Sequence, residues 1–411
     1  MKPFFQVQTL SQVQAYAEAI KPLPSEPVAL LPAAGRTLAA DLAAPHDLPG
    51  FARATMDGYA LRGQDTFGAS ETSPGYLALA GEVVMGRPPA FGLGPGQCAR
   101  IGTGGMLPKG ADAVVMVEHT RLLGEATVEV SKSVAPGANT LGPCDDAAKG
   151  QVLLPAGHRL RPQDVGLLAA LGISQAQAVQ RPRVGIISTG DEVVPVEADC
   201  GPGQVRDVNT YTLASQVCQA GGEPEVVGLV PDQEDALRSA VARSLERCEL
   251  TLLSGGSSMG ARDLTVGVFM SFPGAELLVH GVAVSPGKPF IWVRAGRKQL
   301  LGLPGQVASC LITFHLFVEP ILERLLGRPA RSFTRFSRLA ARLTRSLPSV
   351  SGREEFVRVK VARSADGFRA EPLFGKSGLL STLVQGQGLV RVPLNSEGLD
   401  AGASVEVLLF P

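Results

Sequence analysis

The sequence predicts a multidomain protein that combines a three-layer α/β domain with mostly β segments. Between residues 183 and 327, apolar strands alternate with helical patterns, which is typical of an α/β domain built on a mostly parallel sheet. From residue 48 to 143, and again after Pro329, short β-branched runs are separated by turn-forming residues and indicate β structure. The length of 411 residues suits about two to four domains.

The elements follow from hydrophobic periodicity and helix stop signals. Residues 7–21 carry apolar side chains at helical spacing until Pro22, and residues 162–172 repeat this pattern until Gly172. Within the α/β segment, we predict helices over 209–220, over 233–246 with Asp232 as N-cap, and over 306–326. The predicted domains are an N-terminal and linker domain (1–47 with 144–180), an elongated mostly β domain (48–143), the α/β domain (181–328) and a C-terminal β-barrel-like domain (329–411).

Composition excludes several classes of function. Lys and Arg number 38, as do Asp and Glu, so no net charge attracts nucleic acid or an anionic membrane. No apolar run approaches the roughly 18 residues of a membrane span, and the first residues lack a signal-peptide core. The six Cys residues contain no Cys-x-x-Cys pair, which argues against a zinc or disulfide framework. We therefore expect a soluble, cytoplasmic protein.

Four apolar strands run into short Gly-rich polar loops, at residues 183–192, 250–260, 282–289 and 300–305. Open parallel sheets bind ligands at the carboxyl ends of their strands, so these loops are expected to converge on one pocket. Glycine lets backbone N–H groups approach a ligand, Ser and Thr add hydroxyl donors, and Lys288 adds a positive charge. The pattern predicts an anion site; each loop alone would be read as a tight turn.

Three carboxylates lie in or beside these loops, at Asp191, Glu192 and Asp263. They would repel a bare phosphate, whereas a hard divalent cation such as Mg²⁺ would bridge carboxylate and phosphate oxygens. We therefore predict these three residues as metal ligands. The sequence has no Gly-x-Gly-x-x-Gly in a βαβ context, no Walker-type loop and no Gly-x-Ser-x-Gly elbow, so it gives no support to covalent catalysis.

The order of motifs resembles the molybdopterin molybdenumtransferase family, the MoeA type that includes the gephyrin E domain. The resemblance spans essentially the whole chain. It is carried by Met56-Asp-Gly-Tyr-Ala60, Gly110-Ala-Asp-Ala-Val-Val115, Ser188-Thr-Gly-Asp-Glu192, Asp207-Val-Asn209, Ser254-Gly-Gly256 with Asp263, Pro286-Gly-Lys-Pro289 and Gly302-Leu-Pro-Gly305.

The resemblance implies a homodimer whose active sites combine the α/β domain of one subunit with the β domain of the other. It implies a Mg²⁺-dependent reaction in which adenylylated molybdopterin and molybdate give molybdenum cofactor and AMP, with molybdate displacing a copper ion, and a partner protein that supplies the adenylylated substrate. The implied catalytic residues are Asp191, Glu192, Asp207, Asp263 and Lys288. The implied binding residues are Asp57, Thr103, Asp146, Ser188, Thr189, Gly190, Ser254, Gly255, Gly256, Ser257, Pro286, Gly287, Pro304 and Gly305.

Three of these residues have a purely structural alternative. Asp207 would equally serve as a helix N-cap. Asp57 precedes Gly58 and Thr103 stands among glycines, both of which are ordinary turn patterns.

The chain also departs from the family pattern at three places. Ser285 stands where the family has the first Lys of Lys-Pro-Gly-Lys-Pro, and Gln306-Val307 replaces Asn-Pro. Residues 137–146 lack the usual arginines and carry Cys144 in place of Gly. Arg206 and Arg262 would restore some positive charge, or would simply face solvent.

Two alternatives to the transferase remain open: the departures favour the first, and the second rests on fold analogy alone. The first is a catalytically weakened paralogue that binds molybdopterin or acts as a scaffold, and the second is a phosphosugar or nucleotide enzyme on the same α/β fold.

Overall fold

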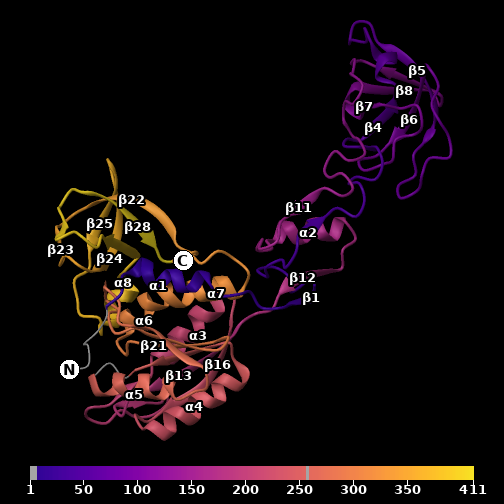
Figure 1. The fold of residues 1–411 in the computed structure, drawn as a ribbon. Coiled ribbons are helices and arrows are strands. Elements are labelled where there is room, and N and C mark those ends of the chain that lie inside the picture. Colours follow the sequence, from indigo (N-terminus) through magenta and orange to yellow (C-terminus); the bar gives the residue numbers. More distant parts are fainter. Residues whose placement is uncertain (1–6, 256–258) are drawn as a thin grey trace. The chain divides into compact units, whose positions relative to one another are not determined.

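The computed structural model describes residues 7–255 and 259–411, which divide into two compact units (Figure 1). The larger unit holds residues 7–27, 35–39 and 177–411, and the smaller unit holds residues 28–34 and 40–176. Among the helices described, none is both long and apolar enough to cross a membrane.

A mixed six-stranded sheet is the centre of the larger unit. Its order is β16-β13-β17-β21-β20-β18; the first four strands are parallel, and β20 and β18 are antiparallel to their neighbours. This confirms the predicted mixed, mostly parallel sheet. The strands are β13 (Arg183–Thr189), β16 (Glu223–Val230), β17 (Leu250–Ser254), β18 (Ala275–His280), β20 (Ile291–Ala295) and β21 (Lys298–Leu303).

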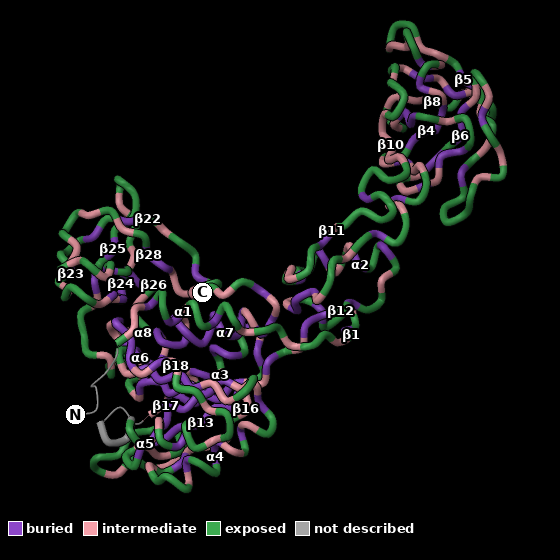
Figure 2. The backbone as a smooth tube through the Cα atoms, in the orientation of Figure 1, coloured by how far each residue is buried: buried purple, intermediate pink, exposed green. Residues whose placement is uncertain are grey.

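Helices cover both faces of this sheet and make the three predicted layers. One core packs Ile186 of β13 against α1, α3 and the α6-η3-α7 segment, and a separate core packs its neighbour Ile187 against α4 and α5. Adjacent residues of one strand thus serve opposite cores, and Figure 2 shows the central strands as mostly buried. The helices are α1 (Leu10–Glu18), α3 (Asn209–Ala220), α4 (Glu234–Arg247), α5 (Met259–Met270), α6 (Val307–Thr313), the π-helical η3 (Phe314–Val318) and α7 (Glu319–Leu325).

The C-terminal part of the larger unit is a small β-barrel. Five strands close on themselves in the order β24-β25-β22-β28-β26, because β26 also pairs with β24. All these pairs are antiparallel except β22–β25, and a ring with an odd number of strands requires such an exception. The elements are β19 (Val284–Ser285), β22 (Ser337–Leu343), β23 (Leu347–Pro348), β24 (Glu354–Ser364), β25 (Gly367–Pro372), α8 (Leu380–Gln385), β26 (Gly388–Val392), β27 (Gly398–Leu399) and β28 (Ser404–Leu409).

The smaller unit is mostly β, as predicted. Its main sheet has the order β7-β4-β6-β5-β9-β8. Its elements are β2 (Leu42–Ala43), β3 (Arg53–Ala54), β4 (Gly58–Leu61), η1 (Gly63–Thr66), β5 (Gly75–Glu82), β6 (Gln97–Ile101), β7 (Ala113–Met116), η2 (Val117–His119), β8 (Thr120–Leu123), β9 (Thr127–Val130), β10 (Thr140–Leu141), β11 (Val152–Leu154) and α2 (Pro162–Ala170). The remaining strands are β1 (Ser25–Ala29), β12 (Gln175–Val179), β14 (Val193–Val194) and β15 (Val205–Arg206).

Candidate functional site

A cavity of about 740 Å³, here called the strand-end cavity, lies where β13, β17 and β21 end. The three strands are parallel neighbours, so their carboxyl ends meet at one edge of the sheet. Predicted residues from several separate segments line it: Ser188, Thr189, Gly190, Glu192, Asp207, Ser254, Gly255 and Gly305. Three of the four Gly-rich loops therefore converge here.

Gly255 shows why this edge requires glycine. Its φ of +133° is one that L side chains rarely adopt, and a Cβ atom there would lie 2.1 Å from the carbonyl oxygen of Thr189. The two loops can therefore approach each other only because position 255 has no side chain. This close approach brings the ends of β13 and β17 to the same cavity.

The carboxylate of Asp207 is buried and fully engaged. Its Oδ1 accepts hydrogen bonds from the Ser188 hydroxyl (3.1 Å) and the Thr210 N–H (3.1 Å), and its Oδ2 accepts one from the Thr210 hydroxyl (2.6 Å). The bond from the Thr210 N–H, together with the bond from Ser188, ties the first turn of α3 to the end of β13. The N-cap of α3 is Val208, so Asp207 stands one residue before it and the predicted N-cap role is corrected to this tie.

Two other buried polar atoms on the cavity wall are unsatisfied. Ser254 Oγ and Asn209 Oδ1 have no hydrogen-bond partner within residues 7–255 and 259–411, although their residues are only 1% and 8% exposed. Asn209 is held in place because its Nδ2 donates to the carbonyl of Gly305 (2.8 Å). An unpaired buried polar atom costs free energy, so two of them facing one cavity indicate atoms that a polar ligand would satisfy.

Asp232 also lines this cavity, which corrects its expected role. It was predicted to cap α4, but the N-cap is Gln233 and no side chain bonds there. Instead Asp232 Oδ1 accepts a hydrogen bond from the Thr189 hydroxyl (2.5 Å), and its N–H donates to Asp191 Oδ1 (3.3 Å). Asp191 is exposed and does not line the cavity, but through this hydrogen bond it helps to hold Asp232 in place.

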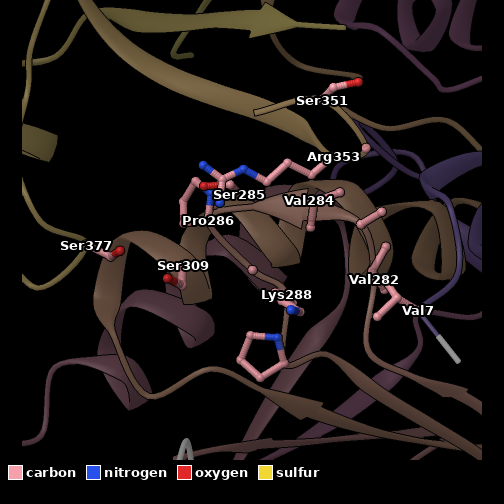
Figure 3. A pocket seen from close by; sticks show the side chains of 14 residues that line it. Val7, Val282, Val284, Ser285, Pro286, Lys288, Ser309, Ser351, Arg353 and Ser377 are labelled. Carbon is pink, nitrogen blue, oxygen red and sulfur yellow. The ribbon is translucent and has the colours of Figure 1, made fainter. Parts of the chain in front are cut away.

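The fourth Gly-rich loop lines a second, neighbouring cavity of about 480 Å³, here called the Lys288 cavity (Figure 3). It contains the predicted residues Pro286, Gly287 and Lys288. The expectation of a single pocket is therefore corrected to two. The cause is β19: it pairs in parallel with β24 of the barrel, which draws this loop to the barrel side of the sheet edge.

Arg353 is a residue of the Lys288 cavity that sequence reasoning missed. It comes just before β24, and Figure 3 shows its guanidinium group beside Ser285. Its Nη2 lies 3.6 Å from Glu355 Oε2, while the Ser285 hydroxyl donates to the other oxygen of Glu355 (3.2 Å). Arg353 Nε is buried and has no partner among the described residues. A cation from a distant segment thus lies beside the position where the family's first Lys is missing.

Two chain segments, 306–309 and 377–378, contribute residues to both cavities. They are joined by a hydrogen bond from the Ala308 N–H to the Ser377 carbonyl (3.0 Å). Ser309 and Ser377 face the Lys288 cavity, while Val307 and Gly378 face the strand-end cavity. Gln306 and Val307, which replace the family's Asn-Pro, therefore stand between the two pockets.

Two of the remaining predicted residues, Asp263 and Pro304, do not line either cavity. Asp263 is exposed on α5, and Pro304 is buried behind Gly305. Gly256 and Ser257 lie outside the described residues, as does the side chain of Arg262. Within the described residues, no group of three acidic, His or Cys side chains could hold a metal ion. The predicted ligand set Asp191, Glu192 and Asp263 is thus not assembled in the protein alone.

In the smaller unit, Asp57 and Thr103 bind each other. Asp57 Oδ1 accepts hydrogen bonds from the Thr103 N–H (2.6 Å) and from its hydroxyl (2.8 Å). These bonds, the backbone bond first, lower the pKa of Asp57, so this exposed carboxylate is charged at neutral pH. Asp146 belongs to the same unit. It is exposed, and its N–H donates to the carbonyl of Leu48 (3.0 Å).

Comparisons with known families cover nearly the whole chain. Residues 8–172 match the MoeA N-terminal region (domain I and II), residues 185–324 match a probable molybdopterin binding domain, and residues 340–410 match the MoeA C-terminal region (domain IV).

Relatives and solved structures agree with these matches. Molybdopterin molybdenumtransferase of Bacillus subtilis is 33% identical over 94% of this chain and 90% of its own length, and that of Nostoc sp. is 34% identical over 94% and 89%. The crystal structure of the molybdopterin biosynthesis moeA protein from Pyrococcus horikoshii OT3 superposes with a TM-score of 0.83 at 31% identity, covering 98% of this chain and 100% of that one. The predicted α/β plus β fold is thereby confirmed. The chain belongs to the molybdopterin molybdenumtransferase family, a family of transferases.

Proposed function

We propose that this protein inserts molybdenum into molybdopterin, using adenylylated molybdopterin and molybdate and releasing AMP. The observation that carries the proposal is the pair of neighbouring cavities at one sheet edge: one contains Arg206 and the unpaired Ser254 hydroxyl, and the other contains Lys288 and Arg353. Relatives named for molybdenum transfer to molybdopterin support the substrate class.

The strand-end cavity is suited to the phosphates of the adenylylated substrate. The Ser254 hydroxyl has no partner among the described residues and can donate a hydrogen bond to a phosphate oxygen, and Arg206 adds a positive charge to the lining. Glu192 is exposed at the rim, where its carboxylate would take a proton from the attacking water. Water adds to the phosphorus of the AMP group, and the bond from this phosphorus to the bridging oxygen breaks. AMP gains the oxygen of the water, molybdopterin keeps the bridging oxygen on its own phosphate, and one water proton passes to Glu192.

The Lys288 cavity is suited to molybdate. Lys288 and Arg353 supply two positive charges, and Ser309 and Ser377 supply hydroxyl groups. A tetrahedral dianion needs such a set of donors, and Arg353 would supply the charge that Ser285 lacks. We therefore assign to Arg353 the compensation for the missing Lys, because Arg353 lines the Lys288 cavity whereas Arg206 lines the strand-end cavity.

Mg²⁺ dependence is part of the proposal through the family resemblance alone. Because the described carboxylates do not form a metal group by themselves, we derive no reaction step through a metal ion. Two further parts also rest on the resemblance: a homodimer in which Asp57, Thr103 and Asp146 serve the partner subunit's site, and a protein that delivers the adenylylated substrate.

A single-turnover assay tests the function. Purified protein mixed with adenylylated molybdopterin, molybdate and Mg²⁺ should release AMP, and omission of either molybdate or Mg²⁺ should abolish the release. Tight binding of the substrate without AMP above background would instead favour the scaffolding paralogue that the departures at 285 and 306–307 suggest.

A further inference from the structure

A third cavity, of about 410 Å³, lies at the opposite end of β21 from the strand-end cavity. The C-terminal end of α1, the segment 21–24 that follows it and the β20–β21 hairpin form its walls, and Lys298 at the start of β21 belongs to it. It contains none of the residues assigned to the proposed reaction. We call it the Tyr16 cavity.

The rim of the Tyr16 cavity is positive. Four cations line it, Lys21, Arg294, Arg297 and Lys298, against the single carboxylate of Glu249. Arg294 pairs with Glu276 (2.6 Å), and Lys298 donates to the Cys248 carbonyl (2.8 Å). In the part of the chain that the structure describes, the side chains of Lys21 and Arg297 form no hydrogen bond or ion pair, and both are exposed. In a protein without net charge, this local excess attracts an anion.

The floor of the cavity is aromatic and fixed. Trp292 is 1% exposed and meets Tyr16 edge-to-face, with ring centroids 6.1 Å apart. The Trp292 Nε1–H donates to Gln299 Oε1 (2.9 Å), and Gln299 Nε2 donates to the Arg297 carbonyl (3.1 Å), so the indole and the hairpin hold each other. Tyr16 itself is 38% exposed, which leaves part of its ring available to a ligand.

The volume of the Tyr16 cavity and the side chains of its walls determine which class of anion fits. Ile20, Leu23 and Leu278 add half-buried apolar surface, and 410 Å³ is within the range of small-molecule sites. An inorganic phosphate would leave most of this space and all of its apolar wall unused. An uncharged ring would leave Lys21 and Arg297 without a partner.

We propose that the Tyr16 cavity binds a small ring-bearing monophosphate of the nucleoside monophosphate class. The phosphate lies between Lys21 and Arg297, and the ring packs on Tyr16 and the aliphatic wall. This site is separate from the proposed catalytic cavities and does not depend on their function.

Calorimetry with uridine monophosphate tests the site, because the proposed catalytic substrate carries adenine instead. We expect saturable binding that also changes the fluorescence of Trp292, the one tryptophan of the chain. The double variant Lys21→Ala/Arg297→Ala should weaken binding at least about tenfold, since each side chain makes a charge-assisted hydrogen bond. Both side chains are exposed, so the variant should fold normally.

Matched controls separate the outcomes. Arg206→Ala, in the strand-end cavity, should leave the affinity for uridine monophosphate unchanged; if it weakens binding as much as the double variant, the nucleotide occupies the other cavity and the proposal is wrong. Uridine alone and inorganic phosphate alone should each bind at least about tenfold more weakly. Phosphate that binds as tightly as the nucleotide would refute ring recognition, and the absence of saturable binding would refute the site.

Discussion

Individual residues of the strand-end cavity fall into two kinds, according to whether their polar atoms are already satisfied. Asp207 accepts three hydrogen bonds and so fixes the start of α3 relative to β13. Ser254 Oγ and Asn209 Oδ1 are buried and lack a partner among the described residues. The first kind should govern stability, and the second should govern ligand binding.

Ser254→Ala tests this division. Because the hydroxyl has no partner among residues 7–255 and 259–411, the substitution should leave the unfolding temperature unchanged or slightly higher. It should weaken binding of adenylylated molybdopterin by about 0.5–1.5 kcal/mol, the usual net value of one hydrogen bond. Ser188→Ala is the matched control: it removes a donor to Asp207 and should lower the unfolding temperature. If the Ser254→Ala protein bound the substrate with unchanged affinity, the Ser254 hydroxyl would not be part of the binding site.

Arg353 gives a second test at this scale. Arg353→Ala should raise the molybdate concentration needed for half-maximal AMP release by about tenfold or more, because a charge-assisted bond is worth about 1.5–3 kcal/mol. Ser285→Lys should gain less than about tenfold, since Arg353 already lies beside that position and the new Lys would pair with Glu355. A large gain from Ser285→Lys in the wild-type background would show that the anion site lacks a cation after all.

At the scale of elements, the helices were predictable and their polar contacts were not. The 209–220 pattern gave α3 at its observed bounds, because its apolar spacing and Gly221 mark one amphipathic helix with a left-handed cap. Asp232 misled the prediction because capping and cavity-facing Asp residues look alike in sequence. Arg353 was missed because strand pairing, which no local pattern reveals, brings residue 353 next to residue 285.

At Gly255 the local Gly-rich pattern correctly indicated a close approach between two elements, β13 and β17. Gly255→Ala would place a Cβ 2.1 Å from the Thr189 carbonyl at a φ of +133°, so β13 and β17 could no longer end side by side. We expect a destabilisation of at least about 1–3 kcal/mol and loss of substrate binding. Chemical denaturation and calorimetry measure the two effects. Gly267→Ala, at an open helical position of α5, is the control and should be neutral or stabilising.

A buried carboxylate at the start of α7, that of Glu319, holds the segment that leads from the α/β layers to the barrel. Glu319 is 2% exposed; one oxygen accepts from His315 Nδ1 (2.9 Å) and the Phe333 N–H (3.0 Å), and the other accepts from the Thr334 N–H (2.9 Å) and hydroxyl. Burial acts to raise the pKa of Glu319, but the bonds from His315 and Thr334 together lower it. The charged carboxylate of Glu319 thus holds the segment 331–336 in place.

The pH dependence of stability should report this charge. A carboxylate whose pKa is lower in the folded state stabilises the fold above its unfolded pKa, and that contribution is lost as pH falls through the folded pKa. Glu319→Gln should therefore cost about 1–3 kcal/mol at neutral pH and make unfolding less sensitive to acid below about pH 4.5. Glu406→Gln, which breaks only an exposed pair with Arg338, should change neither property measurably. Identical acid sensitivity of wild type and Glu319→Gln would contradict this explanation.

For the whole molecule, the order of the sequence motifs identifies the family more firmly than any single cavity does. Motifs from both compact units, Asp57 and Thr103 in one and Lys288 in the other, occur in the order expected for the family, and relatives match over 94% of the chain. The hydrogen bonds between Asp57 and Thr103 hold these two motifs together within the smaller unit. We propose that assembly of two copies places these motifs against a catalytic cavity, and this part of the proposal rests on the family resemblance.

Subunit complementation tests that assembly. If each site combines the larger unit of one copy with the smaller unit of its partner, Asp57→Ala and Lys288→Ala should each abolish AMP release as homodimers. Co-expression should produce mixed dimers with one intact site, and random pairing of a twofold dimer predicts recovery of about a quarter of wild-type activity. Lys288→Ala with Arg353→Ala, two changes in the same cavity, should form no intact site, so the mixture should keep the raised molybdate requirement of Arg353→Ala. Mixed Asp57→Ala/Lys288→Ala dimers that are isolated by differential tags yet remain inactive would mean that both residues serve a site within one copy.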